Sequence, residues 1–300
     1  QLFLCWCCRK IVRGGIQIRE KKTYTHLKHK RRKNKDVNKI VIKKTGRGLA
    51  VRFHDKTYDL VFPKNTWSLL PTKLKNLFAQ EFGFISTATM PLVSDINNLT
   101  YNTPQPLFEK ELKEIILHQI PGIADDYEYD TPQTIERFKT IQYSFERTQP
   151  VDAEASAHDG AVVLLSCGKD SLLTLGVARE LDVDITPIHI NDTTTPYENS
   201  FSLKTVKKIE KSSDINVHII TNNIEKLNDF ETWNTSPTCL GYAHMITGFC
   251  FLALPFLHNN ASMVLLGNQQ NMNFSYRTKQ GYIAVSYTHL RAHETVLDLV

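Results

Sequence analysis

The sequence feature that most constrains this chain is a short apolar segment followed at once by a polar loop and a second, helical segment. Residues 161–165 read Ala-Val-Val-Leu-Leu, an apolar run that predicts a strand buried on both faces of a parallel sheet. The polar loop Ser166–Ser171 follows directly, and helical periodicity then extends to Leu181. A strand, loop and helix in this order direct backbone N–H groups and the positive helix end toward one point. The sequence therefore predicts an anion site at 166–171, suited to phosphate.

The segments after this loop alternate between strands and helices. Strands are predicted at 184–191, 215–221 and 261–266, and helices at 201–211 and 241–256. Such alternation predicts βαβ units, in which a parallel sheet carries helices on both faces and binds ligands beyond the carboxyl ends of its strands. The expected fold class is thus α/β, with a Rossmann-like parallel sheet preceded by a small α+β domain.

The predicted domain organisation rests on turn-forming residues and changes of pattern. With 41% hydrophobic residues, the chain can bury a core, which excludes wholesale disorder. Short β-rich runs between 39 and 62, with helical spacing at 71–82 and 107–119, predict a small α+β domain over 38–120. Residues 121–160 are interpreted as a linker, whose pattern is compatible with a short helix at 134–141. Residues 161–284 form the predicted nucleotide-binding domain.

Both ends of the chain differ from this body. The net charge is +5, yet the first 50 residues hold 16 basic and 2 acidic side chains, so the remainder is acidic. Residues 1–37 form a basic arm with three open interpretations: a disordered arm, upstream sequence translated in error, or a nucleic-acid-binding arm. Residues 285–300 resemble the translation of a sequencing-library adaptor and are excluded from fold reasoning. We therefore expect the natural protein to continue differently beyond Ala284.

The cysteine pattern indicates a reducing compartment. The six cysteines are Cys5, Cys7, Cys8, Cys167, Cys239 and Cys250. The CxCC cluster at 5–8 lacks the paired CxxC spacing of a zinc site, and nothing in the pattern resembles a disulfide framework. The opening apolar run is too short for a secretory leader. The apolar stretch 240–257 contains His244, Thr247 and Pro255, which favours a core helix over a membrane span. We expect a cytoplasmic protein without a membrane partner.

The polar loop supports a resemblance to a known superfamily. Its six residues, Ser166-Cys167-Gly168-Lys169-Asp170-Ser171, resemble the SGGxDS signature of the PP-loop superfamily, the N-type ATP pyrophosphatases, although Cys167 stands where the first glycine is usual. These enzymes include GMP, NAD, asparagine and argininosuccinate synthetases. The spacing is too short for a Walker A loop. The resemblance covers 161–284 and implies an adenine nucleotide α-hydrolase-like fold that uses ATP and Mg²⁺.

The resemblance also implies a ligase-type reaction. ATP is cleaved between its α and β phosphates, AMP is transferred to a carboxyl, amide or ureide oxygen of a small-molecule acceptor, and a nitrogen or sulfur nucleophile displaces AMP. By this resemblance Lys169 neutralises the departing pyrophosphate, while Asp170 places Mg²⁺ or the loop, and these two are the predicted catalytic residues. Ser166 and Ser171 would bind phosphate oxygens, and Gly168 would admit the backbone.

Polar residues also follow two other predicted strands. Asn191 and Asp192 follow one strand, and Gly267 and Asn268 follow another, so these four are predicted cofactor-binding residues. Asp192 is a candidate ribose or Mg²⁺ contact, or simply a turn cap. Candidate substrate residues are Glu198, Asn199, His244, Gln269, Gln270, Asn271 and Asn273. For the amide-rich run an ordinary turn stays open, and for His244 a core histidine.

The subfamily and even the class of function stay open. The loop resembles loosely the 7-cyano-7-deazaguanine synthases, although their zinc-binding cysteine cluster is not visible, and the epimerases that act on the glutamate of muramyl-peptide precursors. A tRNA-modifying enzyme and an ATP or AMP sensor without turnover are further alternatives. Because the basic charge belongs to the amino-terminal arm, it gives no support for a nucleic-acid partner, while a tRNA substrate and a homo-oligomer stay open.

Overall fold

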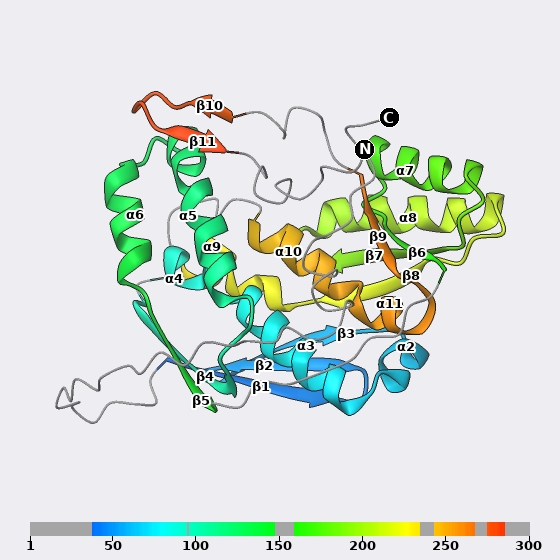
Figure 1. Cartoon of the computed structure of the whole chain (residues 1–300), viewed down its shortest axis with the longest axis horizontal. Coiled ribbons are helices and arrows are strands. Elements are labelled where there is room, and N and C mark those ends of the chain that lie inside the picture. Colours follow the sequence, from blue (N-terminus) through cyan, green and yellow to red (C-terminus); the bar gives the residue numbers. More distant parts are fainter. Residues whose placement is uncertain (1–37, 95, 148–158, 235–242, 268–274, 286–300) are drawn as a thin grey trace, which may run out of the picture.

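The computed structural model describes residues 38–94, 96–147, 159–234, 243–267 and 275–285. Nine strands form one mostly parallel sheet in the order β5-β4-β1-β2-β3-β8-β7-β6-β9, and helices flank it (Figure 1). This arrangement confirms the expected α/β class. No helix within these ranges combines the length and apolar character needed to cross a membrane.

The amino-terminal part of the sheet is the expected meander. Strands β1 (Lys39–Thr45), β2 (Gly48–Phe53) and β3 (Lys56–Val61) pair antiparallel in sequence order. Side chains alternate between a buried face, with Ile42, Val51 and Leu60, and a solvent-facing one. Three helices follow the meander: α2 (Lys64–Leu69), α3 (Thr72–Ile85) and α4 (Met90–Val93). Helix α3 confirms the helix predicted at 71–82.

Residues 121–147 differ from the expected linker. Strand β4 (Asn98–Pro104) and helix α5 (Glu109–Asp126) precede helix α6 (Thr131–Thr140) and strand β5 (Gln142–Arg147). Asp130 caps α6 by accepting a hydrogen bond from the Gln133 backbone N–H at 2.7 Å. Strand β5 pairs in parallel with β4 at the end of the sheet. This stretch is therefore part of the folded core rather than a connection, because tertiary pairing outweighs its polar composition.

The carboxyl-terminal part carries the predicted βαβ pattern. It consists of β6 (Ala161–Leu164), α7 (Lys169–Glu180), β7 (Ile185–Asp192), α8 (Pro196–Ser212), β8 (His218–Asn222), the short η1 (Ile224–Leu227) and α9 (Phe230–Trp233), then α10 (Ala243–Leu252), α11 (Leu254–Asn260) and β9 (Met263–Leu266). The strands β8, β7, β6 and β9 pair in parallel in that order. This confirms the expected parallel sheet.

Strand β6 is buried on both faces, as its apolar run predicts. Ala161 and Val163 pack in a cluster that includes Leu175 of α7 and Val206 of α8. Val162 and Leu164 belong instead to the main core, which contains residues of α10 and α11. Helices thus cover both faces of this part of the sheet.

The long helix predicted at 241–256 is divided in two. Helix α10 ends at Leu252, and α11 begins at Leu254 with Pro255 in its first turn. Proline has no backbone N–H and its ring clashes with the preceding helical turn, so it starts a helix more easily than it continues one.

The two predicted domains share this one sheet. Strand β3 pairs antiparallel with β8 through Leu60↔Asn222 and Val61↔Thr221, and one hydrophobic cluster contains residues from both parts. Farther along, the hairpin of β10 (Ser275–Arg277) and β11 (Ile283–Val285) contacts α5. The boundary expected between 120 and 161 therefore does not interrupt the sheet.

Candidate functional site

The loop between β6 and α7 has the geometry of an anion site. Gly168 is the N-cap of α7, and no side chain caps this helix end. Ser166, Gly168 and Lys169 are exposed, and Lys169 forms no salt bridge with any residue that the structure describes. The N–H groups of a helix's first turn have no intrahelical acceptors. Uncapped N–H groups and a free ammonium are therefore available together at this point.

The two serines of the loop form hydrogen bonds within the turn but differ in exposure. The Ser171 side chain is 3% exposed and its hydroxyl donates to the Gly168 carbonyl at 3.0 Å. The Ser166 hydroxyl donates to Ser171 Oγ at 3.2 Å. Ser171 therefore stabilises the turn, and the exposed Ser166 is the serine better placed for a ligand.

Cys167 has an unusual backbone and a buried side chain. Its φ of 64° lies in the left-handed region, which favours glycine. Its Sγ lies 3.6 Å from the Ser202 carbonyl oxygen, and burial raises the pKa of the thiol. The side chain thus points into the packing between loop and α8. Only the backbone of Cys167 can serve the predicted anion site.

Gly267 is pressed against the first turn of α7. A Cβ at this position would lie 2.5 Å from the Asp170 carbonyl carbon and 2.6 Å from the Ser171 nitrogen. Glycine is therefore required here for a contact between strand end and helix start. We expected the small size of Gly267 to let a nucleotide approach the backbone. In the structure, the backbone of Asp170 and Ser171 lies closest to it instead. Asn268, Gln269, Gln270, Asn271 and Asn273 lie outside the described residues.

The loop lies where the strand order reverses. From β6 the chain continues through β7 to β8 on one side, while β9 pairs with β6 on the other. In open α/β sheets, ligands bind beyond the carboxyl ends of strands at such a reversal. The loop 166–168 follows the carboxyl end of β6 and Gly267 follows the carboxyl end of its neighbour β9, so the topology places them together.

The residues after β7 form a turn of their own. Asp192 Oδ1 accepts hydrogen bonds from the backbone N–H and the hydroxyl of Thr194, both at 2.9 Å. The Asn199 side-chain amide donates to the Asp192 backbone carbonyl. Asp192 thus has the turn-capping role that stayed open in the sequence analysis, and Asn199, a candidate substrate residue, stabilises the same turn. Asn191 is half-buried beside them, and Glu198 is exposed in the first turn of α8.

His244 lies near the carboxylate of Glu225, a residue that the sequence analysis did not identify as a candidate. His244 is 4% exposed, and its Nε2 lies 3.7 Å from Glu225 Oε2. Glu225 belongs to η1, and Asp229 caps α9 just beyond it. Both acidic residues follow the carboxyl end of β8. Ligand-binding residues in parallel sheets follow the carboxyl ends of strands. The position of Glu225 and Asp229 after the strand predicted at 215–221 was therefore a signal for them.

Asp170 is the acidic residue of the loop and therefore the candidate Mg²⁺ ligand there. Asp170 is half-buried in the first turn of α7. The described residues contain no group of three His, Cys, Asp or Glu that could hold a metal ion. Mg²⁺ is usually bound by one or two carboxylates plus substrate phosphates. Asp170, in the loop predicted to bind an anion, therefore fits a Mg²⁺ ion that is also held by the phosphates of a nucleotide.

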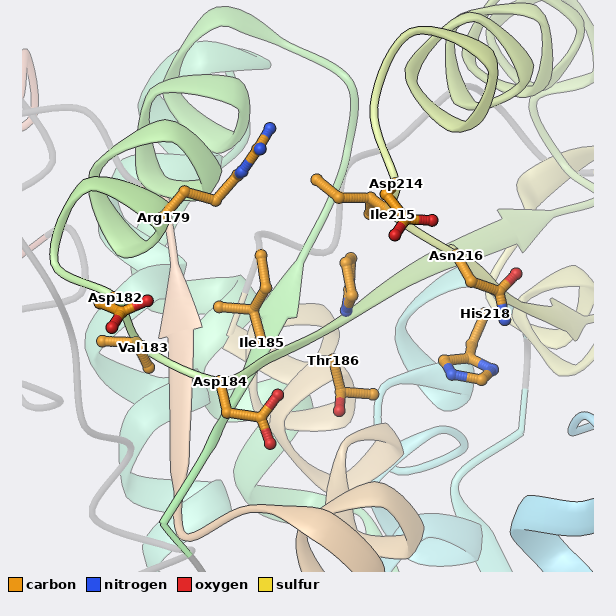
Figure 2. Close-up of a pocket in the computed structure, with 11 residues that line it drawn as sticks. Arg179, Asp182, Val183, Asp184, Ile185, Thr186, Asp214, Ile215, Asn216 and His218 are labelled. Atoms are coloured by element: carbon orange, nitrogen blue, oxygen red, sulfur yellow. The ribbon is translucent and has the colours of Figure 1, made fainter.

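A hollow of about 670 Å³ lies elsewhere, at the amino ends of β7 and β8. Figure 2 shows that its labelled residues come from the end of α7 and the turn after it, from the start of β7, and from the segment that leads into the first residue of β8. They include Arg179, Asp184 and Asp214. This is the edge opposite to the loop 166–171, so the hollow is not part of the candidate site.

Comparisons with models of known protein families, with curated proteins and with solved structures give no match for this chain.

Proposed function

We propose that the chain is an ATP-dependent enzyme of the PP-loop type, which transfers AMP to an oxygen of a small-molecule acceptor and releases pyrophosphate. The observation that carries the proposal is the loop 166–168, with Ser166 and Gly168 exposed, which leads into the uncapped start of α7 where the strand order reverses. The SGGxDS-like residues of this loop favour ATP over other anions.

The proposed first step is a displacement at the α-phosphorus of ATP. The acceptor oxygen forms a bond to this phosphorus while the bond to the bridging oxygen of pyrophosphate breaks. Negative charge grows on the departing pyrophosphate, and preorganised positive groups stabilise it without any proton transfer. Lys169 and the N–H groups of the first turn of α7 supply that charge, and Ser166 donates a hydrogen bond.

In the second step, a nitrogen nucleophile attacks the activated carbon and AMP departs with the acceptor oxygen. Sulfur is the alternative nucleophile. Asp170, together with the phosphates, would hold Mg²⁺, which supplies further charge neutralisation when bound. Gly267 acts indirectly, because its contact with Asp170 and Ser171 holds the start of α7 in place.

The proposal predicts that Lys169→Ala lowers kcat/KM for AMP formation. Removal of one electrostatic contact to the transition state costs on the order of 10²–10³ in rate. The measurement is AMP and pyrophosphate release from ATP with a panel of carboxylic-acid acceptors, and Lys64→Ala, an exposed lysine of α2, is the matched control.

Three outcomes would contradict the proposal. Lys169→Ala could retain wild-type activity, or the product could be ADP. ATP binding by calorimetry without any AMP formation across the panel would instead indicate a nucleotide sensor.

A further inference from the structure

The outer side of helix α8 carries a stripe of aromatic and basic side chains. We define the α8 stripe by its exposed members, which are Tyr197, Phe201, Lys204, Lys207, Lys208 and Lys211. Each lies three or four residues from another member, so they share one side of the helix. Val206, on the opposite side, is 1% exposed and packs with residues of β6. The apolar side of α8 therefore covers the sheet beside α7 (Figure 1), and the stripe faces solvent.

The two aromatic members are the most exposed phenylalanine, tyrosine or tryptophan side chains among the residues that the structure describes. Tyr197 is 88% exposed and Phe201 is 64% exposed. They are four residues apart, which is about 6 Å along the helix axis. Both rings are therefore accessible for stacking by a ligand.

The four lysines of the stripe have no acidic partner. None of them forms a salt bridge with a residue in the described ranges. Lys204 and Lys208 are four residues apart, as are Lys207 and Lys211, and like charges at this spacing destabilise a helix. The lysines therefore do not serve helix stability, whereas a polyanion would neutralise their repulsion.

The two glutamates of α8 lie off the stripe. Each residue turns the helix by about 100°, so Glu198 is rotated by that angle from Tyr197. Glu210 Oε1 accepts a hydrogen bond from the Val217 backbone N–H at 3.1 Å, on the side of the sheet. Because the chain after residue 50 is acidic as a whole, the positive charge of the stripe is a local feature.

Aromatic rings and unpaired lysines on one face match a single strand of nucleic acid. Each nucleotide carries one phosphate charge, which lysine neutralises, and one flat base, which stacks on an aromatic side chain. The stripe extends over about 21 Å from Tyr197 to Lys211, the length of several nucleotides. A membrane surface is a poorer match, because an interfacial helix inserts its apolar side into lipid, and that side of α8 packs on the sheet.

We propose that the α8 stripe binds single-stranded nucleic acid, with its lysines on the phosphates and with Tyr197 and Phe201 stacked on bases. The aromatic end of the stripe adjoins the candidate anion loop, where the Ser202 hydroxyl donates to the Ser166 carbonyl at 3.5 Å. A bound strand therefore reaches the candidate site. This inference goes beyond the proposed function and does not depend on it.

The test of stacking measures binding to the full chain by fluorescence anisotropy. Two labelled probes of about 12 nucleotides are compared, an oligothymidylate and an abasic strand with the same phosphates. We expect the wild type to bind the thymidylate at least about 5-fold more tightly, because stacking contributes this much per base. Tyr197→Leu/Phe201→Leu abolishes the preference, whereas Tyr197→Phe/Phe201→Tyr, which keeps both rings, retains it.

The test of the lysines measures how binding of the thymidylate depends on salt. Each neutralised phosphate of a single strand adds about 0.7 to the slope of log affinity against log salt concentration. Lys204→Ala/Lys208→Ala should therefore lower the slope by about 1.4. Lys110→Ala/Lys139→Ala, exposed lysines of α5 and α6, should leave it unchanged. Because residues 1–37 are the same in all variants, any contribution of the basic arm cancels in the difference.

Equal wild-type affinity for the two probes overturns the inference, and this result does not require any variant to fold. An unchanged slope in a folded Lys204→Ala/Lys208→Ala protein overturns it as well. Binding to phosphatidylserine vesicles that needs these lysines, without oligonucleotide binding, contradicts it by assigning the stripe to a membrane.

AMP formation from ATP is measured in parallel and separates this inference from the proposed function. Base-dependent oligonucleotide binding without AMP formation contradicts only the proposed function. AMP formation by a protein that does not bind the oligonucleotides contradicts only the inference about the α8 stripe.

Discussion

Cys167 illustrates how one residue departs from the loop that it resembles. Its left-handed φ of 64° costs a non-glycine residue about 1–2 kcal/mol. Strain of this kind persists where the surrounding structure holds it, and such positions cluster at functional sites. A glycine at this position would carry no such cost, so Cys167 adds a buried side chain to the turn at the expense of backbone strain.

The buried Glu81 predicts a pH dependence of stability. Glu81, in α3, is 1% exposed and accepts backbone hydrogen bonds from Leu107 at 2.7 Å and Phe108 at 3.1 Å. Burial raises its pKa to about 7, whereas an unfolded glutamate titrates near 4.3. The folded state then binds the proton more tightly, so the free energy of unfolding is highest below about pH 4.3 and falls as pH rises to about 7.

The size of this loss is roughly 4 kcal/mol, because each pKa unit corresponds to about 1.4 kcal/mol. Urea unfolding between pH 4.5 and 7.5 measures it. We expect a flatter profile for Glu81→Gln, and an unchanged one for Glu136→Gln, which replaces an exposed glutamate of α6. A Glu81→Gln profile as steep as that of the wild type would show that other groups cause the dependence.

At the scale of elements, the contact between β9 and α7 decides the shape of the candidate site. Gly267→Ala places a Cβ 2.5 Å from the Asp170 backbone, so strand and helix must separate. We expect a loss of about 1–3 kcal/mol in the free energy of unfolding, as is typical of overpacked positions, together with weaker ATP binding.

Gly176→Ala is the matched control for this contact. Gly176 lies within α7, and a Cβ there would meet nothing within 4 Å. Alanine is the better helix former by about 0.8–1 kcal/mol, so this variant should be more stable than the wild type. Urea unfolding of both variants tests the pair. If Gly267→Ala were as stable as Gly176→Ala, the tight packing of β9 on α7 would be refuted.

At the scale of the whole molecule, the continuous sheet predicts that both halves unfold together. Strands β3 and β8 join the halves, and Leu60 at this junction is fully buried. Leu60→Ala removes core volume and should cost about 2–5 kcal/mol. We expect native-state hydrogen exchange of the amides in β2 and β6 to report the same opening free energy, and Leu60→Ala to lower both equally.

A different result would favour two independently folding domains. In that case, amides of β6 would keep their protection in Leu60→Ala while those of β2 lost it. Such an outcome would support the separate domains predicted over 38–120 and 161–284.

The local residue pattern by itself predicts several helices and strands of this protein. The apolar run 161–165, the loop after it and the periodicity of α7 predict a strand, an anion site and a helix, because each property depends on residues adjacent in the chain. The same holds for the β1–β3 meander and for α3. The predicted strand, helices and meander agree with the structure, while the anion site and the ATP chemistry stay predictions.

Tertiary structure alone decided which distant residues meet. The pairing of β3 with β8, the packing of Gly267 on Asp170 and the approach of His244 to Glu225 join segments that are separate in sequence. Such contacts depend on strand order and on how helices cover the sheet, and periodicity within one segment carries no information about either. Within the linker expected over 121–160, the short helix considered at 134–141 corresponds to α6, whereas β5 was not expected, since the polar composition of 142–147 conceals a strand that pairs with β4.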